Sequence, residues 1–157
     1  MELTGTQKLP AVQDAVWSAL NDPEMLKRCI PGCQRIELIA ENEYQMDMIA
    51  SVGPIKAKFQ GKLTVSDVVP PQSYSIDFEG SGGVAGFGKG HTEVTLGAEG
   101  NETLLTYTAS AQVGGKIAQL GARLINGVAA KLADAFFKKF KEEISETSAH
   151  EITPEGS

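Results

Sequence analysis

The chain has 157 residues, the size of one ordinary globular domain, and its hydrophobic content of 41% is typical of a folded protein. Its net charge of −6 argues against nucleic acid as a partner, because phosphate binding normally requires a basic face. No apolar run reaches the length of about 18 residues that a membrane-spanning helix needs, so the sequence predicts no such helix.

The first ten residues, MELTGTQKLP, lack the basic start and the apolar core of a signal peptide. We therefore expect a cytoplasmic protein, in which Cys29 and Cys33 stay reduced. Zinc sites and redox motifs usually place about two residues between their cysteines. Three residues separate this pair, and no second Cys/His pair accompanies it, so we expect two small thiols at a turn and no metal site.

Short elements are expected at the N-terminus. Alternation over residues 2–9 predicts a short edge strand. Apolar side chains then recur at helical spacing over 11–21, which predicts an amphipathic helix of about three turns. Asp22 and Pro23 have the residue types of an N-cap and of a first helical position, so a second short helix should follow over 23–29.

Strands in series follow. The clearest covers residues 55–66, where apolar residues alternate with polar ones. Further alternating stretches occupy 44–52, 74–78, 92–96 and 105–113. Consecutive strands joined by short turns should pair as an antiparallel meander. Together with the first strand they predict a sheet of six to seven strands with one apolar face.

One long helix is expected near the C-terminus. Residues 114–144 run without a proline for about eight turns, and two neighbouring apolar rows, including Leu124 and Leu132, form a broad face for burial. Residues 145–157 are polar and contain few apolar side chains, which predicts a disordered tail. We therefore expect one domain over residues 1–144 and a tail over 145–157.

These elements predict an α+β protein in which a curved antiparallel sheet wraps around the long helix, with two short helices after the first strand. A sheet that grips a helix leaves a space between them, and small inward residues such as Gly61 and Ala109 favour empty volume there. The residues expected to face this cavity are Met46, Met48, Ala57, Phe59, Leu63, Ile76, Phe78, Phe87, Tyr107, Leu120 and Leu124. Nearly all are apolar, so the cavity should bind an apolar ligand; the alternative is that they simply fill the core.

A glycine-rich segment over residues 80–90 resembles a phosphate-binding loop, because residues 83–89 spell GxxxxGK. Such a loop needs Ser or Thr after the lysine and then a helix, whereas Gly90 and a strand follow here. We therefore expect no nucleotide site. The segment is either a bulged part of a strand or a mobile lip over the cavity with Phe87 at its tip.

The sequence contains no clear set of catalytic residues. His91 and His150 are its only histidines, and neither has an obvious nucleophile or acid beside it. We therefore predict that the protein is not an enzyme and assign no catalytic residue. The alternative is a small cyclase, hydratase or dehydratase, for which Tyr44, Tyr107 and His91 are the polar candidates.

Four stretches resemble the CoxG family, named for the G component of carbon monoxide dehydrogenase, and together they span roughly residues 1–142. They are VWSALNDPEMLKRCIPGC, GPIKAKFQGKLTVSD, GSGGVAGFGKGHTEVTL and YTASAQVGGKIAQLGARLI. The family belongs to the START/Bet v 1-like superfamily, so the resemblance implies a helix-grip fold. This fold agrees with the one expected from periodicity.

The resemblance also implies a function. Family members are accessory subunits of molybdenum hydroxylases such as aerobic carbon monoxide dehydrogenase, and they are not the redox catalyst. They are thought to link the enzyme to the membrane and to bind a quinone or a lipid-like molecule, with no other cofactor. The last eight residues here, HEITPEGS, contain no apolar segment, so this sequence predicts peripheral membrane contact only. A docking subunit without a ligand is the second interpretation.

Overall fold

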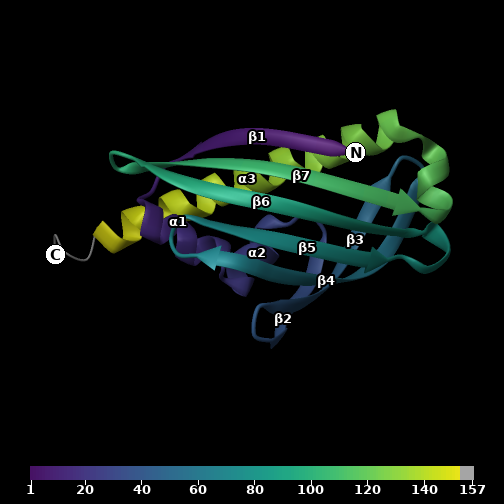
Figure 1. Cartoon of the computed structure of the whole chain (residues 1–157), viewed down its shortest axis with the longest axis horizontal. Coiled ribbons are helices and arrows are strands. Elements are labelled where there is room, and N and C mark those ends of the chain that lie inside the picture. Colours follow the sequence, from purple (N-terminus) through teal and green to yellow (C-terminus); the bar gives the residue numbers. More distant parts are fainter. Residues whose placement is uncertain (153–157) are drawn as a thin grey trace.

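The computed structural model describes residues 1–152, with side chains described through residue 145. It is an α+β structure, as the sequence predicted: a curved antiparallel sheet wraps around one long helix (Figure 1). The elements in chain order are β1 (Glu2–Leu9), α1 (Gln13–Leu20), α2 (Pro23–Cys29), β2 (Cys33–Ala40), β3 (Glu43–Val52), β4 (Ile55–Val69), β5 (Ser73–Ser81), the 3-10 turn η1 (Gly83–Ala85), β6 (Phe87–Glu99), β7 (Glu102–Gly114), the 3-10 helix η2 (Gly115–Leu120) and α3 (Ala122–Ile152).

The seven strands form one sheet in the order β1-β7-β6-β5-β4-β3-β2, and every neighbouring pair is antiparallel. Strands β2 to β7 are therefore a meander, and β1 joins the sheet beside β7. The sequence did not predict β2 as a separate strand. Its burial pattern lacks the alternation that reveals a half-buried strand, because only Ile36 in β2 is buried.

The two short helices have local causes that the sequence shows. Asp22 accepts a hydrogen bond from the backbone N–H of Glu24 at 3.0 Å, and Pro23 occupies the first position of α2, which confirms the predicted N-cap. Asn21 ends α1 and donates from Nδ2 to the Trp17 carbonyl at 2.9 Å. The ion pair between Arg28 and Glu143 then joins α2 to α3.

The predicted helix over 114–144 begins later and ends later than expected. Residues 115–120 form η2, and α3 begins only at Ala122, because Gly121 has a φ of 94° that interrupts the helix. At the other end α3 continues to Ile152, so the expected domain boundary at residue 144 lies inside it. Residues 153–157 of the predicted disordered tail lie outside the described residues.

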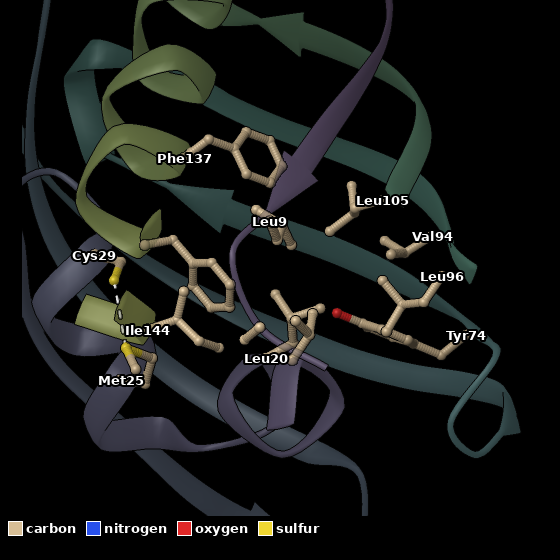
Figure 2. Close-up of a cluster of buried hydrophobic side chains, with 13 residues drawn as sticks. Leu9, Leu20, Met25, Cys29, Tyr74, Val94, Leu96, Leu105, Phe137 and Ile144 are labelled. Atoms are coloured by element: carbon tan, nitrogen blue, oxygen red, sulfur yellow. Dashed lines mark hydrogen bonds between the residues drawn. The ribbon is translucent and has the colours of Figure 1, made fainter. Parts of the chain in front are cut away.

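The main hydrophobic core lies where α1, α2 and the C-terminal half of α3 meet the sheet. Figure 2 shows this cluster, in which Leu9 comes from β1, Leu105 from β7 and Phe137 from α3. Phe140 and Ile144 are fully enclosed, with exposed fractions of 0% and 1%. The core therefore fixes the end of the sheet-and-helix assembly at which the two short helices lie.

Aromatic rings cover several inward glycines of the sheet. A Cβ atom added to Gly61 or to Gly80 would lie 2.7 Å from a ring carbon of Phe78, and one added to Gly5 would lie 2.8 Å from the Tyr107 ring. Gly61 and Gly80 are paired across β4 and β5. The expectation that Gly61 leaves empty volume was therefore wrong, because the Phe78 ring occupies that space.

Candidate functional site

A cavity of about 340 Å³ lies between the concave face of the sheet and α3, with α1 and α2 at one side. Six of the seven strands contribute to it, and α3 closes it from the opposite side. Its lining residues are Leu3, Leu20, Asn21, Leu26, Ile30, Tyr44, Met46, Leu63, Val65, Tyr74, Ile76, Phe78, Thr92, Val94, Leu105, Tyr107, Ala109, Ala133, Phe136 and Phe137.

Aromatic side chains form much of the wall. Tyr107 stacks on Phe137 with ring centroids 5.5 Å apart, and Phe136 meets Phe137 edge to face at 5.1 Å. These contacts join β7 to the middle of α3 and hold the rings in defined positions. Such a wall suits a flat apolar ligand, because ring faces offer large contact areas without a requirement for hydrogen bonds.

Five lining side chains are polar, namely those of Asn21, Tyr44, Tyr74, Thr92 and Tyr107, and none of the lining residues is charged. The sequence analysis selected Tyr107 for the cavity and missed Tyr74. The signal for Tyr74 was present, because it precedes Ile76 and Phe78 at the period-two spacing that placed those two residues in the cavity.

Burial controls the ionisation of the three tyrosines. It is the first cause that raises the pKa of Tyr44, of Tyr74 and of Tyr107 above the ordinary tyrosine value. Nearby acidic groups raise two of these pKa values further: Asp22 acts on Tyr44, and Asp134 acts on Tyr107. All three hydroxyls therefore stay protonated at neutral pH and remain hydrogen-bond donors.

Five of the predicted cavity residues line this space: Met46, Leu63, Ile76, Phe78 and Tyr107. They come from β3, β4, β5 and β7, so the inward register read from alternation holds for the middle of these strands. Ala109, which was expected to leave volume, also lines the cavity.

Five others lie toward the opposite end of the assembly, away from α1 and α2. Phe59 lies over Gly82, where an added Cβ would come 2.7 Å from its ring atom Cδ1. Leu124 lies over Gly53, with Leu120 also nearby. Met48 packs against the small cluster around Ile36, Tyr44 and Met46, and Ala57 pairs with Ala50 near the β3–β4 turn. None of the five is among the cavity-lining residues.

Phe87 is on the outer face of the sheet, which corrects the prediction of an inward lip. Its side chain is 55% exposed, and its ring covers Gly114, its partner on β7. Side chains alternate along β6, and Val94 and Leu96 are the buried ones, so the odd-numbered residues must point outward. Sequence reasoning missed this parity because the glycines between 80 and 90 show no alternation.

His91 also lies on the outer face, so the three polar candidates for a catalytic reaction are not brought together. Its Nδ1 atom is 2.9 Å from Oδ1 of Asp77, and this hydrogen bond raises the pKa of His91 above the ordinary histidine value. Tyr44 and Tyr107, by contrast, line the cavity on the inner face. The sheet itself separates the imidazole from the cavity.

The two cysteines are free thiols. The Cys29 Sγ is buried 3.7 Å from the Met25 sulfur, and burial raises the pKa of this thiol to about 11. Burial also raises the pKa of Cys33. Through the part of the chain that the structure describes, no group of three or more His, Cys, Asp or Glu side chains has a metal-binding arrangement.

The family model for CoxG, the G component of carbon monoxide dehydrogenase, matches residues 5–145 of this sequence, which is most of the chain. The chain belongs to the CoxG family. Family and fold together support a ligand-binding accessory role. No match was found among curated protein sequences. Within residues 1–152, no helix is both long enough and apolar enough to cross a bilayer.

Several solved structures share the fold of this CoxG family member. A conserved protein from Geobacillus kaustophilus is 38% identical, with a TM-score of 0.89 over 94% of this chain and 97% of that one. A START superfamily protein from Mycobacterium smegmatis is 13% identical, with a TM-score of 0.71 over 93% and 98% of the two chains. The Zhui aromatase/cyclase from Streptomyces sp. R1128 is 15% identical, with a TM-score of 0.63 over 92% and 93%. The last two likenesses concern the fold alone, and they confirm the START/Bet v 1-like architecture.

Proposed function

We propose that this protein is a non-catalytic accessory subunit of a molybdenum hydroxylase of the carbon monoxide dehydrogenase type. In this role it binds an apolar molecule, a quinone or a lipid, and links the enzyme to the membrane. The observation that carries the proposal is the cavity of about 340 Å³, which has aromatic and aliphatic walls and no charged lining residue. Burial of an apolar ligand there is favourable by roughly 25 cal/mol per Å² of apolar area.

The size of the cavity refines the expected ligand. Ligand sites commonly range from about 300 to 1,000 Å³, and this one is near the lower limit at about 340 Å³. We therefore propose that the cavity takes a ring system or a short apolar segment. The sequence alone had favoured a long isoprenoid or acyl chain, and most of such a chain would have to lie outside this cavity.

One end of the molecule supports the proposed membrane link. This basic end consists of residues 49–60, 80–90 and 111–130, and it contains five exposed cations and no Asp or Glu. The cations are Lys56, Lys58, Lys89, Lys116 and Arg123. The three segments lie together, since Gly53 is beside Leu124, and Gly86 is beside Gly114 and Ile117.

The basic end also carries exposed apolar side chains. Val84 is 94% exposed, Phe87 is 55% exposed and Leu124 is 38% exposed. A protein with a net charge of −6 that gathers its cations around such side chains has a surface suited to anionic lipid headgroups. We propose that this end faces the membrane.

The ligand part of the proposal is tested with protein purified without detergent. Native mass spectrometry and organic extraction should recover a quinone or a lipid, and an apolar fluorescent probe should bind stoichiometrically to the extracted protein. Ala133→Phe fills the cavity from α3 and should weaken probe binding. Ala57→Phe is the matched control, because Ala57 lies outside the cavity and should leave affinity unchanged. Equal affinity in both variants, or no binding by the wild type, would contradict the proposal.

The partner enzyme is tested by co-purification. A tagged copy of this chain, expressed with the subunits of a carbon monoxide dehydrogenase-type hydroxylase, should retain the enzyme on a column. The alternative of a docking subunit without a ligand predicts the same retention, together with no bound molecule in the extraction experiment. Absence of any complex would reject both partner hypotheses.

A further inference from the structure

Hydrogen-bond donors outnumber fixed acceptors in the cavity. The hydroxyls of Tyr44, Tyr74 and Tyr107 all belong to lining residues, and none has a hydrogen-bond partner in the part of the chain that the structure describes. Buried hydroxyls are normally paired, because an unpaired donor loses the hydrogen bonds that it makes in water. These three donors are therefore available to a ligand.

Tyr74 is the most enclosed of the three. It is 5% exposed, and Trp17 on α1 meets its ring edge to face with centroids 5.3 Å apart. Figure 2 shows the ring extending from β5 with its hydroxyl directed toward Leu20, which lines the same cavity. Because Trp17 holds the ring, the hydroxyl position is set by packing rather than by a hydrogen bond.

Tyr44 supplies a second buried donor. It is 9% exposed and lies on β3, and its electrostatic effect raises the pKa of Tyr74 beyond the effect of burial. The two hydroxyls therefore lie near one another. Tyr107 differs, because it is only half-buried and its hydroxyl lies over the backbone of Gly5.

The cavity lacks the groups that would hold an ionised ligand. No lysine, arginine or histidine is among the lining residues, so a carboxylate or phosphate placed there would lose its hydration without gaining a cation. Asn21 uses its Nδ2 atom to donate to the Trp17 carbonyl, which leaves its side-chain oxygen as an acceptor.

We infer that Tyr44 and Tyr74 are specificity-determining residues that donate hydrogen bonds to a neutral, oxygen-bearing head group of the ligand, and that they orient this head toward α1. This inference rests on the proposed function, since it assumes that the cavity binds a ligand. It separates aryl ketones and quinones, whose oxygens are neutral acceptors, from fatty acids and from plain hydrocarbons.

The test compares three probes of similar shape by isothermal titration calorimetry. They are 2-methyl-1,4-naphthoquinone, 2-methylnaphthalene and 2-naphthoate. The wild type should bind the quinone more tightly than either other probe. Tyr74→Phe and Tyr44→Phe keep the rings and remove one donor each, so each should weaken quinone binding by about fivefold to tenfold, the usual net effect of one hydrogen bond. Neither should weaken binding of the hydrocarbon.

Two controls accompany the variants. Thr108→Val removes a hydroxyl from the exposed face of β7 and should leave all affinities unchanged. The single tryptophan, Trp17, lies against Tyr74, so quinone binding should quench its fluorescence if the head group occupies this end of the cavity. Thermal unfolding of each variant verifies that the fold is intact.

The outcomes separate the two hypotheses. Quinone and hydrocarbon bound equally by the wild type, with unchanged quinone affinity in both phenylalanine variants, would overturn the inference and leave the cavity function standing. Preferred binding of 2-naphthoate would also overturn it. Failure of the wild type to bind any of the three probes would overturn the proposed function itself.

Discussion

Phe78 illustrates how single residues shape this cavity. Its ring lies on the backbone of Gly61 and Gly80, so two strands come close beneath one aromatic side chain. Glycine is required at both positions, because any side chain there would take the space of the ring. The ring thus packs against the sheet and, at the same time, lines the ligand cavity.

Substitution of Gly61 tests this arrangement. A Cβ atom at Gly61 would lie 2.7 Å from the Phe78 ring and 3.0 Å from the Glu79 carbonyl oxygen, so Gly61→Ala should destabilise the fold by about 1–3 kcal/mol. Gly97→Ala is the matched control in β6, because no atom lies within 4 Å of the added Cβ. Urea unfolding midpoints measure both. A stability loss in the control as large as that in Gly61→Ala would show that strand glycines matter here for another reason.

The outer-face pair of His91 and Asp77 gives a prediction on pH. The hydrogen bond raises the pKa of His91 above 6.5, so its stabilising effect is fully present below the pKa of the unfolded state and is lost as pH rises through the folded value. NMR titration should therefore find a His91 midpoint above 6.5 in the wild type and a lower one in Asp77→Asn. Glu93→Gln should lower it less, because Glu93 acts only through its charge. An unchanged midpoint in Asp77→Asn would refute the assignment.

At the scale of elements, the buried face of α3 changes along its length. Phe137, Phe140 and Ile144 are buried in the main core, whereas Leu124 near the start of the helix is 38% exposed. The apolar spacing alone had placed Leu124 on the same buried stripe as Leu132. The break at Gly121 and the position of Leu124 over Gly53 explain why the first turn is less covered.

Truncation along α3 should reproduce this gradient. Phe140→Ala removes a side chain that is 0% exposed and should cost about 3–5 kcal/mol of unfolding free energy. Leu124→Ala should cost much less, and Leu124→Asp should leave the domain folded, in contrast to the expectation from sequence. Calorimetric or urea unfolding of the three variants checks this order. Unfolding of Leu124→Asp would restore the register that the sequence suggested.

At the scale of the whole molecule, charge is distributed unevenly. The basic end has no Asp or Glu, while the chain as a whole has 20 acidic residues against 14 Lys and Arg. The cavity lies between this end and the main core, beneath Phe78 and beside Phe137. A membrane facing the basic end would therefore lie on the side of the cavity opposite α1 and α2.

Vesicle binding tests this orientation. Each cation near an anionic surface contributes about 1 kcal/mol, so Lys56→Glu combined with Arg123→Glu should reduce binding to phosphatidylglycerol vesicles by more than about tenfold. Lys27→Glu combined with Lys138→Glu changes the net charge equally but lies outside the basic end, and should have little effect. Flotation assays measure both. Salt at about 1 M should weaken wild-type binding, since the Debye length falls to about 3 Å. Equal losses in the two double variants would show that net charge alone decides binding.

The sequence by itself determined the fold class, the order of most elements and the inward register of the central strands. These features depend on periodicity and capping, which are local: alternation placed Met46, Leu63, Ile76 and Phe78 on one face, and Asp22 with Pro23 began α2. The family resemblance added the helix-grip architecture. It also supplied the expected accessory role, which no local pattern contains.

Only the tertiary structure decided where the cavity lies and which residues reach it. Phe59, Leu120 and Leu124 have suitable side chains, but each covers another segment, because the long strands and α3 extend beyond the cavity. Phe87 faces outward because the glycines around it carry no pattern from which its parity could be inferred. Tyr74 became a candidate because α1, distant in sequence, brings Trp17 against its ring and leaves the hydroxyl facing the cavity.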